Sequence, residues 1–289
     1  MINGVLPDPR RHAYRPDLAH AALRDHVHAE RYVKGERKQV TAAALPVRRE
    51  PRPDALLETE ALLGETAIVL DEAEGWAWLQ LERDRYVGYA PTSGLSFALA
   101  APTHRIAALR TYVFAAPDGK SPPLALLSMN AGIDVIGTDG KYLVLRNGGF
   151  VFASHTLPIG EPTPDYVRTA EQFLGAPYLW GGRTSVGLDC SGLVQLALEA
   201  AGIACPRDAD MQALEIGRPL EGSALEMRRG DLVFWEGHVG IMTSPSDLLH
   251  ANAYHMAVEK EPLDLAKARI KQALGSDTTC VRRIEIKER

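Results

Sequence analysis

Residues 177–203 constrain the fold of this chain more than any other stretch. They begin with an aromatic and glycine-rich loop and pass through the segment Asp189-Cys190-Ser191-Gly192. Apolar residues then recur at helical spacing, at Leu193, Leu196, Ala197, Ala200 and Ala201. Gly202 follows this pattern, as glycine often does just past the end of a helix. We therefore predict a helix whose first turn holds Cys190.

A cysteine at the start of a helix is a candidate nucleophile. Unpaired backbone N–H groups and the positive end of the helix dipole both favour a thiolate there. A purely structural role is the alternative, because a lone cysteine before a helix more often has that role. The other cysteines, Cys205 and Cys280, make an odd count with no CxxC spacing, which argues against a disulfide framework or a metal site. We expect both to be buried or half-buried thiols in a reducing compartment.

Two histidines follow the predicted helix in strand-like contexts. Residues 232–235, 237–242 and 248–252 are predicted strands, and a helix followed by consecutive strands indicates an α+β domain with a mostly antiparallel sheet. His238 lies between Gly237 and Gly240, which permit close approach of other groups, and His250 lies near the end of the next strand. Neighbouring strands would bring the two imidazoles together, and thiol catalysis needs a base and a third group that orients it. An ordinary core or surface role for each histidine is the alternative.

The segment before this domain reads as β structure. Strand-like runs at 67–70, 76–79 and 86–90 are separated by turn clusters, which is typical of a small barrel. Residues 100–157 contain a similar series of short runs, so we predict a second barrel that repeats the first in architecture. The predicted organisation is an N-terminal arm (1–35), two small all-β barrels (36–98 and 99–160) and a C-terminal α+β domain (161–289). Within the arm, the loose spacing of Leu18, Ala22 and Val27 predicts a short helix up to Ala29.

Composition excludes several functional classes. Charged residues make up 24% of the chain and the net charge is −5, which gives no basic excess for nucleic acid. No apolar run approaches the roughly 18 residues of a membrane span, and the first 20 residues lack the apolar core of a secretory signal. We expect a cytoplasmic monomer without metal or other cofactor. The arm's four histidines show no metal-binding spacing; they are His12, His20, His26 and His28.

The ordered segments YLWGG, LDCSGLVQ, PRDADMQ, GDLVFW, GHVGIM and LLHA resemble the NlpC/P60 family of cysteine peptidases, across roughly residues 165–286. The resemblance implies a papain-like core that acts on bacterial cell-wall peptides. It implies Cys190 as nucleophile, His238 as general base and His250 as the residue that orients it. It also implies that Tyr178 assists an oxyanion hole together with the backbone N–H of Cys190, and that the thiol and imidazole react as an ion pair.

The upstream marks Gly64-Glu65, Gly75-Trp76 and Tyr86-Val87-Gly88-Tyr89 resemble a bacterial SH3 domain. Two such domains before an NlpC/P60 domain resemble the γ-D-glutamyl-L-diamino acid endopeptidases of murein peptide recycling. That resemblance implies the substrate L-Ala-γ-D-Glu-L-diamino acid, with its free amine held by acidic and hydroxyl groups. The implied pocket residues are Asp189, Ser191, Asp208 and Tyr86, with Asp54 or Glu58 as a further carboxylate. Ala209 departs from the serine that this branch often has, so one polar contact is missing or replaced.

Besides the murein-recycling endopeptidase, three alternatives remain open on the sequence. The alternative within the same chemistry is a secreted hydrolase that cuts intact peptidoglycan stem peptides and uses its SH3 domains to bind the wall. A non-enzymatic wall-binding protein is disfavoured by the intact Cys190, His238 and His250. A related acyltransferase or lipid-modifying enzyme is disfavoured by the SH3 pair and by PRDADMQ.

Overall fold

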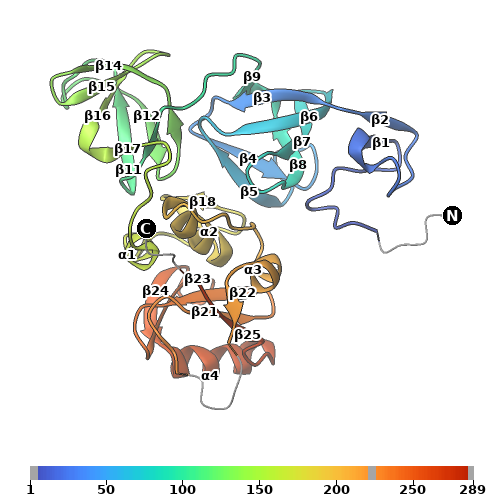
Figure 1. Cartoon of the computed structure of the whole chain (residues 1–289), viewed down its shortest axis with the longest axis vertical. Coiled ribbons are helices and arrows are strands. Elements are labelled where there is room, and N and C mark those ends of the chain that lie inside the picture. Colours follow the sequence, from blue (N-terminus) through green and yellow to red (C-terminus); the bar gives the residue numbers. More distant parts are fainter. Residues whose placement is uncertain (1–5, 221–225, 286–289) are drawn as a thin grey trace. The chain divides into compact units, whose positions relative to one another are not determined.

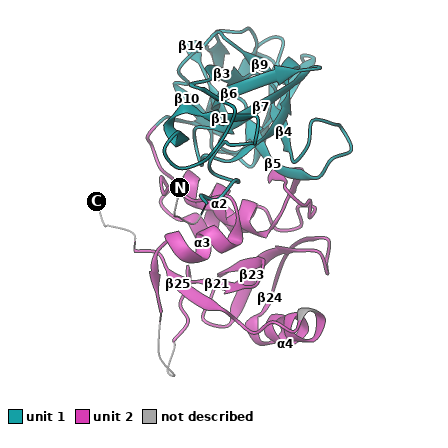
Figure 2. Ribbon diagram, turned by 90° about the vertical axis from the view of Figure 1, so that its right-hand side faces the viewer, with its two compact units in different colours: residues 1–159 teal, residues 160–289 magenta. Residues whose placement is uncertain are grey.

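The computed structural model describes residues 6–220 and 226–285. The first five residues of the predicted arm, and residues 221–225 and 286–289 of the predicted catalytic domain, lie outside the described residues. The chain forms two compact units, residues 1–159 and 160–289 (Figure 2). Unit 1 is β-rich and unit 2 mixes helices with an antiparallel sheet, as the sequence predicts (Figure 1). Among the described residues, no helix is long and apolar enough to cross a membrane.

The first barrel of unit 1 is a seven-stranded sheet in the order β5-β4-β8-β7-β6-β3-β9. Its strands are β3 (Glu36–Val40), β4 (Ala44–Arg48), β5 (Leu57–Leu62), β6 (Thr66–Ala73), β7 (Trp76–Leu81), β8 (Val87–Pro91) and β9 (Leu95–Ser96), with a 3₁₀ turn η2 (Thr92–Gly94) before the last. All three runs predicted in this region are strands.

The second part of unit 1 repeats this pairing. Its elements are β10 (His104–Ile106), β11 (Arg110–Phe114), β12 (Pro123–Ser128), β13 (Gly132–Ile133), β14 (Val135–Asp139), β15 (Tyr142–Leu145), β16 (Phe150–Phe152), η3 (Ala153–His155) and β17 (Thr156–Pro158). β11 pairs with β12 and β16 just as β4 pairs with β5 and β8. A 3₁₀ turn precedes the last strand in both copies, and that strand pairs with the first. The repeat is therefore one of architecture.

The predicted helix at 18–29 is wrong. Leu18 and Ala19 lie in β1 (Leu18–His20), which pairs in parallel with β2 (Arg31–Val33), and only η1 (Ala21–Leu23) is helical. Leu18 packs with Leu70 and Trp78, whereas Ala19 packs with a separate cluster around Leu23 and Val27. Successive side chains that face opposite clusters are the property of a strand, and the tertiary partners on both sides override the weak helical spacing.

Unit 2 is built on a six-stranded antiparallel sheet in the order β20-β25-β21-β22-β23-β24. The strands are β20 (Arg218–Pro219), β21 (Leu232–Trp235), β22 (His238–Met242), β23 (Asp247–Asn252), β24 (Ala257–Pro262) and β25 (Cys280–Arg283). The helices are α1 (Tyr166–Glu171), α2 (Cys190–Ala200), α3 (Ala209–Glu215) and α4 (Leu263–Leu274), and a small hairpin joins β18 (Arg183–Thr184) to β19 (Gly187–Leu188).

Helices cover both faces of this sheet. α2 packs against β22 and β23 from one side, with α1 beside it, and α4 lies on the other side (Figures 1 and 2). Buried side chains of β21, β22, β23 and β25 pack with Leu263, Ala266 and Ile270 of α4. The start of α2 and the first residue of β22 are thus both anchored on a buried scaffold, which is what a fixed site requires.

Candidate active site

Cys190 is the first residue of α2, as the sequence predicts. Asp189 is extended and caps the helix by accepting a hydrogen bond of 2.8 Å from the backbone N–H of Gly192. Gly202, at φ +76°, ends the same segment. The thiol therefore lies at the positive end of an eleven-residue helix.

The backbone N–H of Val239 donates to the Cys190 thiol. Val239 directly follows His238 in β22, so the start of this strand meets the start of α2 at the thiol. Gly240 permits the close packing of β22 beside β23, because a Cβ there would lie 2.7 Å from the Leu248 side chain. Gly237 has a different role from the predicted one: no atom lies near its Cβ position, and its φ of +68° makes the tight β21–β22 turn.

His238 and His250 form a direct hydrogen bond. The ring nitrogens His238 Nε2 and His250 Nδ1 lie 2.8 Å apart, and their strands β22 and β23 are neighbours in the sheet. His250 is fully buried. The expectation that adjacent strands bring the two imidazoles together is confirmed.

Burial keeps the thiol and the imidazole uncharged in the substrate-free site. It raises the pKa of Cys190 to about 12, with a further contribution from the Asp189 charge. It lowers the pKa of His238 to about 3, assisted by His250 and Arg269. The ion pair expected from the sequence stays a prediction. Transfer of the thiol proton to the imidazole creates both charges together, so that each compensates the other.

The histidine chain continues to two residues that the sequence reading missed. His250 Nε2 lies 2.7 Å from Glu261 Oε1 at the end of β24. Arg269 of α4 donates to both carboxylate oxygens of Glu261, at 2.5 Å to Oε2 and with a shorter bond to Oε1. Burial raises the pKa of Glu261, but the hydrogen bonds from Arg269 and His250 outweigh it and bring the pKa to about 2. Glu261 is therefore a carboxylate at any physiological pH.

Tyr178 lies close enough to Cys190 for the two to interact electrostatically. Burial raises the pKa of Tyr178, and the neighbouring Cys190 and Asp189 raise it further. The hydroxyl stays protonated and can donate a hydrogen bond. The backbone N–H of Tyr178 donates to the carbonyl of Met256, which fixes the loop against the β23–β24 turn.

Asp189 and Ser191 lie in a buried polar network around Arg207. Arg207 donates to both oxygens of Asp189, at 2.9 Å and 2.7 Å, and to the Ser191 hydroxyl at 2.9 Å. Asp189 also accepts from the N–H of Gly181 at 2.8 Å. Arg207 lies in the PRDADMQ segment, and the sequence alone predicted no role for it. The amine-binding role of Asp189 and Ser191 stays a prediction, and any such role would have to coexist with these contacts.

Each of the remaining predicted residues has its own local surroundings. Asp208 is half-buried and directly precedes α3, and Ala209 is buried. Tyr86 belongs to the core of the first barrel in unit 1. In the same unit, Glu58 pairs with Arg49, and the exposed Asp54 pairs with Arg52. The substrate contacts expected of these side chains stay predictions.

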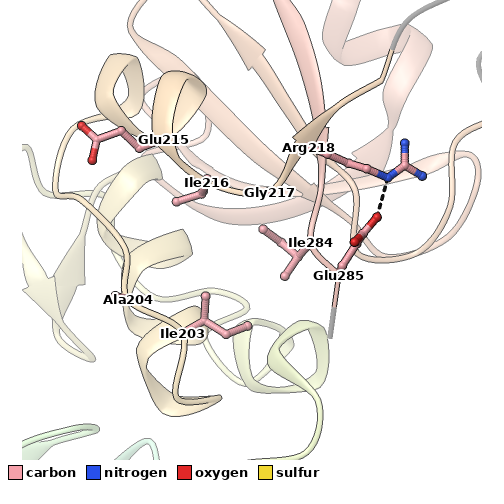
Figure 3. Close-up of a pocket in the computed structure, with 8 residues that line it drawn as sticks. All are labelled: Ile203, Ala204, Glu215, Ile216, Gly217, Arg218, Ile284 and Glu285. Atoms are coloured by element: carbon pink, nitrogen blue, oxygen red, sulfur yellow. Dashed lines mark hydrogen bonds and ion pairs between the residues drawn. The ribbon is translucent and has the colours of Figure 1, made fainter. Parts of the chain in front are cut away.

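A separate cavity of about 470 Å³ lies elsewhere in unit 2 (Figure 3). Its apolar lining comes from Ile203, Ile216 and Ile284, and Arg218 forms an ion pair with Glu285 at its edge (Figure 3). None of the predicted catalytic residues lines it.

Comparison with known proteins finds a matching family in each of the two units. A family model described as the bacterial dipeptidyl-peptidase Sh3 domain matches residues 47–95, and the NlpC/P60 family model matches residues 175–273. A gamma-D-glutamyl-L-lysine dipeptidyl-peptidase of Bacillus cereus is 27% identical over 246 residues, which are 72% of this chain and 71% of that protein. A protein of the same name from Bacillus subtilis is 36% identical over 122 residues, 38% of this chain and 40% of that protein.

Solved structures agree on the fold. The crystal structure of an NlpC/P60 family protein from Bacillus cereus aligns with a TM-score of 0.71 and covers 86% of this chain and 99% of that one. An NlpC/P60 endopeptidase from Photobacterium damselae aligns with a TM-score of 0.60 over 86% of this chain and 71% of that one. Their sequence identities are 21% and 14%, so these alignments carry the fold alone.

Proposed function

This chain is an NlpC/P60 family cysteine peptidase with a bacterial dipeptidyl-peptidase SH3 domain, and on that premise we propose that it releases L-Ala-γ-D-Glu from murein peptides. The bond cut would join the γ-carboxyl group of D-glutamate to an L-diamino acid. The observation that carries the proposal is the hydrogen-bonded His238–His250 pair, which begins beside a thiol at a helix N-terminus.

The proposed reaction is acyl transfer through a thioester. Cys190 Sγ attacks the scissile carbonyl carbon while its proton passes to His238. The oxyanion would be bound by the backbone N–H of Cys190 and the Tyr178 hydroxyl. His238 then gives its proton to the departing amine of the diamino acid and the C–N bond breaks. Water, deprotonated by His238, hydrolyses the thioester and frees the dipeptide.

Selectivity for a free N-terminal L-alanine is the second part of the proposal. The relatives are named dipeptidyl-peptidases, a class that removes two residues from a free N-terminus, and the Bacillus cereus relative matches across both units. Asp208 is the residue that we propose to bind the ammonium group. A site built for a cation in a partly desolvated pocket strongly rejects an acylated amine, because its carboxylate is then left without a counter-charge.

The requirement for a free amine also bears on where in the cell the protein acts. A stem peptide has a free L-alanine amine only after the amide that joins it to the sugar strand has been cut. The peptidase would therefore act on released peptides, and we propose cytoplasmic recycling. The names of the relatives specify L-lysine as the diamino acid, which makes lysine and diaminopimelate the two substrates to compare.

The test uses paired peptides. Purified full-length protein is offered L-Ala-γ-D-Glu-L-Lys, the diaminopimelate analogue, and the N-acetylated form of each. We expect cleavage of the free peptides, loss of cleavage in Cys190→Ala, and unchanged cleavage in the matched control Cys280→Ala. Equal cleavage of free and acetylated peptides would contradict the requirement for an amine. Binding to intact sacculi together with cleavage of acetylated stems would instead support the wall-hydrolase alternative.

A further inference from the structure

The catalytic histidine pair is connected to an ion pair from two other elements of unit 2. Glu261 lies at the end of β24 and Arg269 lies in α4, eight residues further along the chain. The side chains of His250, Glu261 and Arg269 are 0%, 11% and 20% exposed, so the chain of contacts is largely shielded from water. Hydrogen bonds in such a low-dielectric setting strongly prefer one arrangement of protons.

We propose that Glu261, held by Arg269, is a positioning residue that sets the tautomers of His250 and His238 so that His238 Nδ1 is left as the base toward Cys190. This inference rests on the proposed peptidase function. It concerns two residues that neither the family motifs nor the relatives' names identify.

The direction of each hydrogen bond follows from the donor inventory. A carboxylate only accepts, so the 2.7 Å bond at Glu261 Oε1 requires the proton on His250 Nε2. In this proposal His250 is neutral; a neutral imidazole has one N–H, so His250 Nδ1 then accepts. The 2.8 Å bond between the rings therefore requires His238 Nε2 to donate. His238 is then left with an unprotonated Nδ1.

Arg269 makes this arrangement stable. Its guanidinium binds both oxygens of Glu261 and lies 4.5 Å from the centre of the Tyr254 ring, which holds it from a second side. Two charge-assisted donors keep the glutamate ionised and fix the direction of its Oε1. Without this clamp, a protonated Glu261 could donate to His250 and reverse every proton in the chain.

Glu261→Gln is the informative substitution. The single oxygen of the new amide is expected to face Arg269, which has only donors, and the NH₂ group then faces His250 Nε2. His250 would shift its proton to Nδ1 and donate to His238, which would become protonated on the nitrogen needed as a base. A wrong tautomer of this kind lowers kcat by roughly 10²- to 10⁴-fold while the shape of the site is kept.

The control is Glu199→Gln. Glu199 forms an ion pair with Arg183 at 3.0 Å, and its side chain is 13% exposed, so its burial and partner match those of Glu261. It lies near the end of α2, away from the nucleophile. A general loss of stability from removal of a half-buried carboxylate appears in both variants, whereas a change of tautomer appears only in Glu261→Gln.

The test measures ¹⁵N chemical shifts of ring nitrogens in histidine-labelled full-length protein without substrate, with His238 assigned from the His238→Gln spectrum. We expect wild type and Glu199→Gln to carry the His238 proton on Nε2, and Glu261→Gln to carry it on Nδ1 with a lower kcat and an unchanged KM. A wild-type His238 protonated on Nδ1 would overturn the proposal, as would an unchanged tautomer in folded Glu261→Gln. Should Glu261→Gln not fold, Arg269→Met must show the same shift. Because these spectra need no substrate, a failure of the peptide assay leaves this result independent of it.

Discussion

Arg207 and Asp189 form a bidentate ion pair at the start of α2, with Nη1 2.9 Å and Nη2 2.7 Å from the two oxygens of the carboxylate. The same carboxylate caps α2 at Gly192, so one buried arginine fixes the residue that precedes the nucleophile. Arg207 is 1% exposed. The electrostatics of the helix start therefore depend on a side chain 17 positions beyond Cys190.

Arg207→Met is expected to destabilise the protein strongly. It leaves Asp189 buried without its counter-charge, and breaking a buried pair in this way costs about 3–5 kcal/mol. Urea unfolding of unit 2 measures the loss, and Arg207→Lys should recover only part of it because lysine cannot bind both oxygens in a fork. A change below about 0.5 kcal/mol would contradict the structural role assigned to this pair.

Gly192→Ala is expected to disturb the nucleophile by steric overlap. A Cβ at residue 192 would lie 2.6 Å from the carbonyl oxygen of Gly182, which is backbone of the loop that carries Tyr178. Forced overpacking of this kind costs about 1–3 kcal/mol and shifts the helix start. Gly137→Ala is the control, because its Cβ would meet no atom within 4 Å. Thermal unfolding and kcat are measured for both, and similar values for the two variants would refute the expectation.

Acid is expected to weaken the fold through His238. An unfolded histidine binds a proton below about pH 6.5, whereas folded His238 resists protonation down to a pKa of about 3. The unfolded state therefore binds more protons in this window, and the free energy of unfolding falls as the pH decreases, by up to about 1.4 kcal/mol per pH unit.

The measurement compares wild type with His238→Gln between pH 7.5 and 5, above the range in which Glu261 titrates. The variant should lose most of the slope between pH 6.5 and 5. An identical slope in the two proteins would show that other groups cause it.

Asp208→Ala is expected to raise KM for peptides with a free N-terminal amine by about 10- to 100-fold, because a charge-assisted hydrogen bond to the ammonium group is worth about 1.5–3 kcal/mol. Any slow cleavage of N-acetylated peptides should change little. Asp210→Ala is the matched control, since Asp210 is an exposed carboxylate in the first turn of α3. A uniform loss on all peptides would argue for a structural role of Asp208 instead.

The helix start at Cys190 and the strand positions of His238 and His250 could be predicted because local patterns mark them. Cys190 follows a capping residue before an apolar helix, and each histidine lies in a short strand with clear turns. Glu261 and Arg269 could not be found in this way. Their position depends on the register of β23 against β24, in which Leu248 faces Glu261 and His250 faces Glu259, and on the packing of α4. Neither is visible in the spacing of residue types.

The same limit explains the N-terminal error and the missed role of Arg207. Leu18 and Ala19 are strand residues because other parts of unit 1 pack on each of them, and the loose spacing around them carries no trace of those partners. Arg207 was visible as a letter beside Asp208, yet its partner Asp189 lies 18 positions earlier. Contacts of that range are decided by the tertiary fold.

The order of the catalytic parts along the chain has a consequence for biosynthesis. Cys190 precedes His238 by 48 positions and Arg269 by 79, and the proposed positioning of His238 requires β22, β23, β24 and α4 together. A growing chain that ends before α4 therefore contains Cys190 but lacks Arg269, the last residue of the proposed proton path. Completion of the proposed proton path therefore requires the C-terminal part of unit 2.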